Sequence, residues 1–137
     1  MRLFIDANIL FSAAYLGRSR TRAIFDLAAA GFCECITSAY ALDEARRNLL
    51  KRHPDRLAAL DQTAADLAIV REPNMEFRAW AAGLGVSEKD VPILAAAAQA
   101  SADWLVSGDR GFAPLYGKKL RGVELMLPAE AIRRLIG

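Results

Sequence analysis

Hydrophobic and polar positions follow two different periods along the chain. Large apolar residues at positions 3–5 form a short run that ends at Asp6, and a run of this length predicts a buried strand of a parallel sheet. Similar short runs predict further strands at residues 32–36, 68–70, 104–106 and 123–127.

Between these runs, apolar residues recur every three or four positions, which is the period of an amphipathic helix. They predict helices at residues 8–15, 40–52, 75–84, 91–102 and 128–136, two more that begin at the capping residues Thr21 and Asp55, and a loop or short helix at 110–116. Strands that alternate with helices are typical of a three-layer α/β/α domain with a mostly parallel central sheet. At this length we expect a single domain over residues 1–137.

Composition and charge leave several partners open. With 54% hydrophobic and 25% charged residues, the composition is that of a globular protein. The net charge of +2 permits contact with a phosphate backbone without requiring it, because solvated faces also carry short basic clusters. The clusters are Arg18, Arg20 and Arg22; Arg46, Arg47, Lys51 and Arg52; and Lys118, Lys119 and Arg121.

The sequence gives no sign of a membrane or secreted protein. No apolar stretch is long and uncharged enough to cross a bilayer, and the start of the chain lacks a signal-peptide pattern. Cys33 and Cys35 are the only cysteines, and their spacing disfavours a disulfide. We therefore expect reduced thiols and a cytoplasmic protein.

Four carboxylates stand at comparable places in the predicted elements. Asp6 ends the first strand, and Asp109 follows the fourth. Asp90 begins the helix before that fourth strand, and Glu44 lies in the helix after the second strand. Because ligand sites lie outside the carboxyl ends of parallel strands, we expect all four to face one cleft.

Crowded carboxylates favour a bound cation. Each raises the pKa of its neighbours unless positive charge neutralises them. Oxygen ligands without nearby His or Cys favour Mg²⁺ or Mn²⁺ over zinc. One or two such ions could activate a water and stabilise a phosphoryl oxyanion.

Each carboxylate also has an ordinary structural role open to it. Asp6 and Asp90 suit helix N-caps. Glu44 suits a solvated helix face, and Asp109 suits a turn because Ser-Gly-Asp is good turn chemistry. The metal-site interpretation rests on the joint pattern.

Four blocks of the sequence resemble the PIN-domain family: FIDANIL, TSAYALDEARRNL, KDVPILAAAAQASADWLVSGD and RGFAPLYGKKLRGVELMLPAEAI. The resemblance runs over nearly the whole chain and includes the order and spacing of the acids. It implies a metal-dependent ribonuclease fold of the kind found in VapC-type toxins of toxin–antitoxin pairs. By position, the family's metal-site acids match Asp6, Glu44, Asp90 and Asp109, and its supporting polar residues match Asn8 and Ser107.

The resemblance also implies partners, and the chain departs from the family at two positions. RNA as the substrate, a cognate antitoxin and a homodimer are the implied partners. Ser107 stands where the family usually has Thr, and Gly111 stands where it often has an acidic or His residue. Our first hypothesis is therefore a Mg²⁺- or Mn²⁺-dependent endoribonuclease, with Glu44 completing the metal shell or orienting the attacking water.

Two other functions are consistent with the residues. A phosphohydrolase of the haloacid-dehalogenase type also has an Asp after its first strand, but needs a second Asp where this chain has Asn8. A PIN fold that only binds RNA or a protein partner is the other alternative, and Gly111 leaves room for it. We expect His53 to be structural, and the tyrosines Tyr15, Tyr40 and Tyr116 are open candidates for substrate contact.

Overall fold

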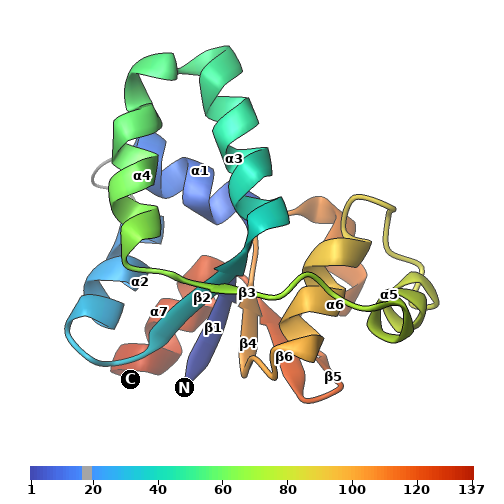
Figure 1. Cartoon of the computed structure of the whole chain (residues 1–137). Coiled ribbons are helices and arrows are strands. Elements are labelled where there is room, and N and C mark those ends of the chain that lie inside the picture. The colour runs from blue at the N-terminus through green and yellow to red at the C-terminus, as the bar shows by residue number, and fades with distance from the viewer. Residues whose placement is uncertain (17–19) are drawn as a thin grey trace.

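The computed structural model describes residues 1–16 and 20–137 and has three layers (Figure 1). Arg18, a member of the first basic cluster, lies outside the described residues. In the described chain the central sheet has six strands in the order β3-β2-β1-β4-β6-β5. They are β1 (Arg2–Ile5), β2 (Glu34–Ser38), β3 (Ala68–Val70), β4 (Trp104–Val106), β5 (Lys119–Leu120) and β6 (Val123–Met126).

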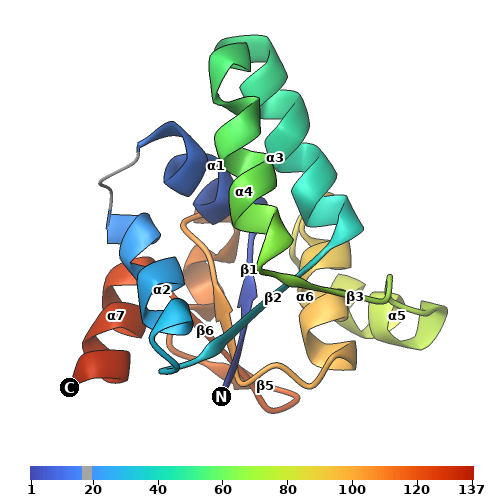
Figure 2. The same ribbon diagram turned by 60° about the vertical axis from the view of Figure 1, so that its left-hand side comes forward.

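Helices cover both faces of this sheet, which confirms the predicted α/β/α class. Figures 1 and 2 show α2 and α7 on one side, α5 and α6 on the other, and α3 and α4 rising beyond the carboxyl ends of the strands. The α-helices are α1 (Ala7–Tyr15), α2 (Arg20–Ala29), α3 (Ala39–Arg52), α4 (Leu57–Ala65), α5 (Met75–Ala82), α6 (Val91–Gln99) and α7 (Pro128–Ile136). The 3₁₀ helix η1 (Pro54–Arg56) joins α3 to α4, and the 3₁₀ helix η2 (Arg110–Leu115) lies between β4 and β5. No helix in the described residues is long and apolar enough to cross a membrane.

Three predicted boundaries and one missing strand need correction. Thr21 lies inside α2 and does not cap it, because the helix already includes Arg20. Asp55 makes no capping bond, because Pro54 starts η1 and α4 begins only afterwards. The second strand begins at Glu34 instead of residue 32. The Glu34 N–H donates to the Met1 carbonyl at 2.8 Å, which is where pairing with the first strand starts. The prediction missed β5, which pairs antiparallel with β6.

The two central strands, β1 and β4, position the residues of the candidate site. Leu3, Phe4 and Ile5 of β1 are fully buried, as are Leu105 and Val106 of β4. Their burial on both faces confirms the strands predicted from short apolar runs. β1 and β4 pair in parallel, with Ile5 opposite Val106.

Candidate functional site

The candidate site begins where β1 and β4 end. β1 connects through α1 and α2 to β2 on one side of it in the sheet, whereas β4 lies on the other side. Ligands of open α/β sheets bind at such a reversal of strand order, outside the carboxyl ends of the strands. Because Ile5 pairs with Val106, the next residues, Asp6 and Ser107, come side by side.

Asp6 is both a helix cap and a buried charge. Its Oδ1 accepts a hydrogen bond from the Ala7 N–H at 2.6 Å at the start of α1, and only 3% of the residue is exposed. The predicted capping role is therefore present, and the other carboxylate oxygen has a second partner.

Ser107 connects that second oxygen to the rest of the site. Its hydroxyl donates to Asp6 Oδ2 at 2.6 Å and accepts hydrogen bonds from the Asp109 N–H at 3.1 Å and from Asn8 Nδ2 at 3.3 Å. A serine hydroxyl has one donor and two acceptor positions, so all of its capacity is used. Asn8 Oδ1 in turn accepts from the Gly108 N–H at 3.1 Å. One buried hydroxyl thus positions three of the predicted site residues.

Asp90 lies behind this group at the start of α6. Its side chain makes no capping bond; Oδ2 instead accepts from the Ser87 hydroxyl at 2.7 Å. The Asp109 carboxyl group lies close enough to Asp90 to contribute to the raised pKa of Asp90. A Cβ at Gly111 would overlap Asp90 Oδ2 and lie 3.3 Å from Asp109 Oδ1. The glycine at this position therefore leaves room for the pair of carboxyl groups.

A cleft of about 210 Å³ opens over the other acids. Asp6, Glu44 and Asp109 line it together with Asn8, whereas Asp90 is not among its lining residues. The structure therefore brings Asp6, Asn8, Glu44 and Asp109 to one cleft and places Asp90 against Asp109. Larger hollows occur elsewhere, including one of about 410 Å³ beside α2, so the convergence of acids, and not size, marks this cleft.

The pKa values of these carboxyl groups depend mainly on burial and then on their neighbours. Burial raises the pKa of Asp6 from 3.8 to about 6, and the charges of Glu44 and Asp90 add to the increase, against the opposing effect of the Ser107 hydrogen bond. Burial also raises the pKa of Asp90. For Asp109, the Gly111 N–H at 2.8 Å, the neighbouring Asp90 carboxyl group and the Lys89 ammonium outweigh burial and lower the pKa.

A divalent cation fits this set of residues in chemical type and charge. The donors are carboxylate, amide and hydroxyl oxygens, which Mg²⁺ and Mn²⁺ prefer. The buried Asp6 has a raised pKa that a nearby cation would reverse. However, no three His, Cys, Asp or Glu side chains in the described residues are arranged to hold one ion. Lys89 Nζ lies 3.4 Å from Asp109 Oδ2, so an ion on that oxygen would have to displace it.

Several cleft residues were missed by the sequence analysis. Lys89 was not identified, although it directly precedes Asp90. Asn48 and Arg52 line the cleft together with Glu44. Their spacing of four residues on α3 places them on one helix face, and this spacing was the available signal.

The three tyrosines proposed for substrate contact differ in their surroundings. Tyr116 is half-buried and its hydroxyl donates to the Asp109 carbonyl at 2.8 Å, while burial raises its pKa to about 12. The Tyr40 hydroxyl donates to the Lys89 carbonyl at 3.2 Å. Both support loops of the site, whereas 40% of Tyr15 is exposed.

Comparisons with known proteins agree with this architecture. VapBC2 from Rickettsia felis, solved bound to a DNA fragment from their promoter, superposes with a TM-score of 0.70 at 18% identity and covers 93% of this chain and 98% of its own. PAE2754 from Pyrobaculum aerophilum superposes with a TM-score of 0.71 at 18% identity, and the match covers 99% of this chain and 96% of PAE2754. VapC20 from Mycobacterium tuberculosis is described as a sarcin-ricin loop cleaving toxin. It superposes with a TM-score of 0.59 at 16% identity, and the match covers 82% of this chain and 93% of VapC20.

These identities establish similarity of fold alone. A search of curated protein sequences gave no significant match. A family model described as the PIN domain matches residues 2–111, which is most of the chain and includes every predicted site residue. The chain therefore belongs to the PIN-domain family.

Proposed function

We propose that this protein is a Mg²⁺- or Mn²⁺-dependent endoribonuclease that hydrolyses RNA phosphodiesters. The observation that carries the proposal is the meeting of Asp6, Glu44 and Asp109 in one cleft at the reversal of strand order. Burial and, to a smaller extent, the charges of Glu44 and Asp90 raise the pKa of Asp6, and a bound cation would relieve this cost of its negative charge. Membership of the PIN-domain family supports this activity.

The residues divide into ligands and positioning groups. Asp6, Asp90, Asp109 and Glu44 would hold one or two ions. A bound ion supplies a water of lowered pKa and neutralises charge on the phosphoryl oxygens. Ser107 fixes the Asp6 carboxylate through its 2.6 Å hydrogen bond, and Asn8 braces Ser107 and the Gly108 backbone. The largely exposed Lys89 ammonium offers positive charge to a phosphate beside Asp109.

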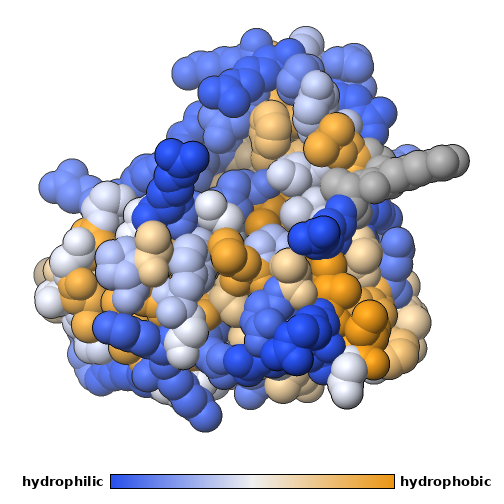
Figure 3. Space-filling view, turned by 180° about the vertical axis from the view of Figure 1, so that it is seen from behind, coloured by the Kyte–Doolittle hydropathy of each residue, from blue (hydrophilic) through white to orange (hydrophobic). Residues whose placement is uncertain are grey.

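We further propose that the protein is the toxin of a toxin–antitoxin pair in the cytoplasm and forms a homodimer. The resemblance to VapC-type toxins supports the antitoxin. An apolar surface supports the dimer: Figure 3 shows hydrophobic residues gathered on the side where α2 and α7 lie. Leu127 and Ile136 at the two ends of α7 are 47% and 65% exposed. Light scattering of the purified protein at several concentrations tests this, and a monomer throughout would exclude the dimer.

A PIN fold that binds RNA or protein with little catalysis is the second candidate. The ion pair between Lys89 and Asp109 favours it, because the ammonium already neutralises one acid of the cleft. The phosphohydrolase alternative is weaker, because the side chain at its second-Asp position is Asn8, already engaged with Ser107 and Gly108.

Cleavage of a mixed RNA pool separates these candidates. The purified protein is incubated with Mn²⁺ or Mg²⁺ and then with EDTA, beside Asp6→Asn and Asp43→Asn. Asp43 neighbours Glu44 in α3 but does not line the cleft, so its variant removes the same charge away from the site. We expect cleavage that EDTA and Asp6→Asn abolish and Asp43→Asn preserves. Full activity of Asp6→Asn would contradict the assignment, and RNA binding without cleavage would favour the second candidate.

A further inference from the structure

An aromatic cluster lies beside the acidic cleft, between the second halves of α1 and α3. The rings of Tyr15 and His53 stack with centroids 3.9 Å apart and planes 19° apart. Phe11 lies 6.0 Å from Tyr15 and 6.3 Å from His53, and it also lines the acidic cleft. Because 40% of Tyr15 is exposed, the cluster offers aromatic surface to a ligand that enters the cleft.

Both helices that carry this cluster also position an acid of the cleft, with Asp6 at the start of α1 and Glu44 inside α3. Asp6 caps α1 and Ser38 caps α3, and the helices pack against each other. At a rise of about 1.5 Å per residue, Tyr15 lies roughly 13 Å along α1 from Asp6, and His53 lies a similar distance along α3 from Glu44. We use the word groove for the acidic cleft, which Phe11 and Arg52 line, together with the aromatic cluster beside it. From the acids to the Tyr15–His53 pair it spans the length of a few nucleotides.

Along α3, the side chains that line this groove change from acidic to neutral to basic. Glu44, Asn48 and Arg52 follow one another four residues apart, and all three line the cleft. Arg52 is exposed, and none of the ion pairs found among residues 1–16 and 20–137 involves it. Its guanidinium is thus available to an anion next to the aromatic cluster.

Backbone contacts hold the aromatic end in place. Arg56 Nε donates to the Ala14 carbonyl at 2.9 Å, which ties the end of α1 to η1. The His53 N–H donates to the Leu49 carbonyl at 2.7 Å and closes the last turn of α3. A surface ordered before binding loses less entropy when a ligand arrives.

We propose that Arg52 and the Tyr15–His53 pair contact the RNA beside the bond that is cut, with a phosphate on Arg52 and a base stacked on the pair. Unpaired bases stack on Tyr and His side chains, whereas the bases of a duplex are already stacked inside it. An Arg beside such a platform binds the backbone and sets the register of the strand. The inference rests on the proposed function and assigns residues that position its RNA next to the bond that is cut.

Binding of a short fluorescent single-stranded RNA tests this, measured by anisotropy at several salt concentrations. Asp6→Asn in EDTA serves as the background, so that RNA is bound without being cut. In this background Tyr15→Ala should raise the Kd about tenfold and leave the salt slope unchanged, since stacking carries no charge. Arg52→Ala should also weaken binding and reduce the slope of log K against log salt by about 0.7.

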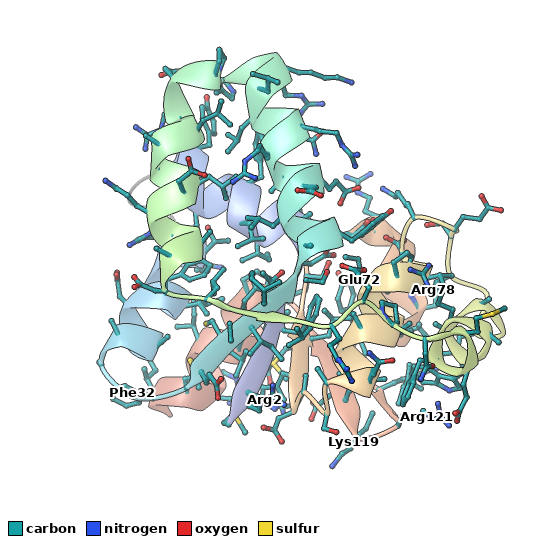
Figure 4. All side chains as sticks on the ribbon, in the orientation of Figure 1. Arg2, Phe32, Glu72, Arg78, Lys119 and Arg121 are labelled. Carbon is teal, nitrogen blue, oxygen red and sulfur yellow. The ribbon has the colours of Figure 1, made fainter. Side chains whose placement is uncertain are left out.

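Matched variants separate these contacts from general effects. Tyr15→Trp keeps a stacking surface and should preserve binding. Phe32→Ala and Lys119→Ala remove an aromatic ring and a charge at the opposite end of the strands, where Figure 4 places both residues, and should bind as the background does. Urea unfolding of each variant confirms that it is folded.

The outcomes separate this inference from the proposed nuclease activity. If the wild type cleaves RNA but Tyr15→Ala and Arg52→Ala bind as tightly as the two controls, the inference is wrong and the nuclease stands. Tighter binding of duplex than of single-stranded RNA would also overturn it. If the background binds no RNA and the wild type cuts none, both proposals fail.

Discussion

Asp6 carries an electrostatic cost that stability measurements can detect. Its pKa is raised from 3.8 to about 6 in the folded protein, mainly by burial. The folded state therefore holds a proton that the unfolded state has released, and stability falls as pH rises between these values. A shift of this size corresponds to about 3 kcal/mol.

Urea unfolding of the wild type and Asp6→Asn in EDTA, from about pH 4 to pH 7, measures this cost. The stability of the wild type relative to the variant should fall by about 2–3 kcal/mol over that range. A difference that does not change with pH would show that Asp6 is not buried as described.

Ser107 is the residue on which the site geometry most depends. Ser107→Ala leaves Asp6 Oδ2 without its donor and the Asp109 N–H without its acceptor. We expect a loss of about 1–3 kcal/mol in the free energy of unfolding, because these groups are buried, and a large loss of cleavage. Ser107→Thr keeps the hydroxyl and should retain most of the activity. Equal stability and activity of all three proteins would contradict the role of this hydroxyl.

Glycine is required at position 111 because the Asp90 carboxyl group lies against it, and not because of its backbone conformation. A Cβ there would overlap Asp90 Oδ2, so Gly111→Ala should displace that carboxyl group and reduce cleavage about tenfold or more, a misplacement effect. At Gly108 a Cβ would lie 3.8 Å from Asn8 Oδ1, an ordinary contact. Gly108→Ala is therefore the matched control, and comparable activity of the two variants would refute the argument.

At the scale of elements, the sequence predicted those with strong periodicity and missed the shortest. The strands with fully apolar runs and the helix Pro128–Ile136 were predicted with bounds close to those observed. β5 has two residues and no apolar run. The available sequence signal was Gly122: in the structure, Arg121 and Gly122 form the turn after β5 and both have positive φ, 50° and 83°. Such a pair forms the two-residue turn favoured in β-hairpins.

This turn gives a prediction for the β5–β6 hairpin. Gly122→Ala places a Cβ in a left-handed conformation and should cost about 1 kcal/mol of stability. Because this hairpin lies at the other end of the strands (Figure 1), cleavage by the folded variant should be unchanged. Urea unfolding and the RNA assay check both statements, and lost activity in a stable variant would contradict them.

At the scale of the whole molecule, the order of strands explains why part of the site could be predicted. Asp6 directly follows β1 and Asp109 follows the end of β4 after Ser107 and Gly108, so a parallel sheet was enough to place them at one edge. The groups that set their environment come from other segments: Lys89 precedes α6, and Arg52 ends α3. Which of these side chains face the cleft depends on helix packing, which the local pattern of the sequence does not specify.

Binding of Mn²⁺ is the measurement that tests most directly whether these acids act as one site. Calorimetric titration at about pH 7.5 would compare the wild type with Asp6→Asn, Asp109→Asn and Asp43→Asn. We predict that the wild type and Asp43→Asn bind one or two ions per chain and that both cleft variants lose most of this affinity. Unchanged binding by folded Asp6→Asn and Asp109→Asn would contradict the account, because the ion would then be held elsewhere on the protein.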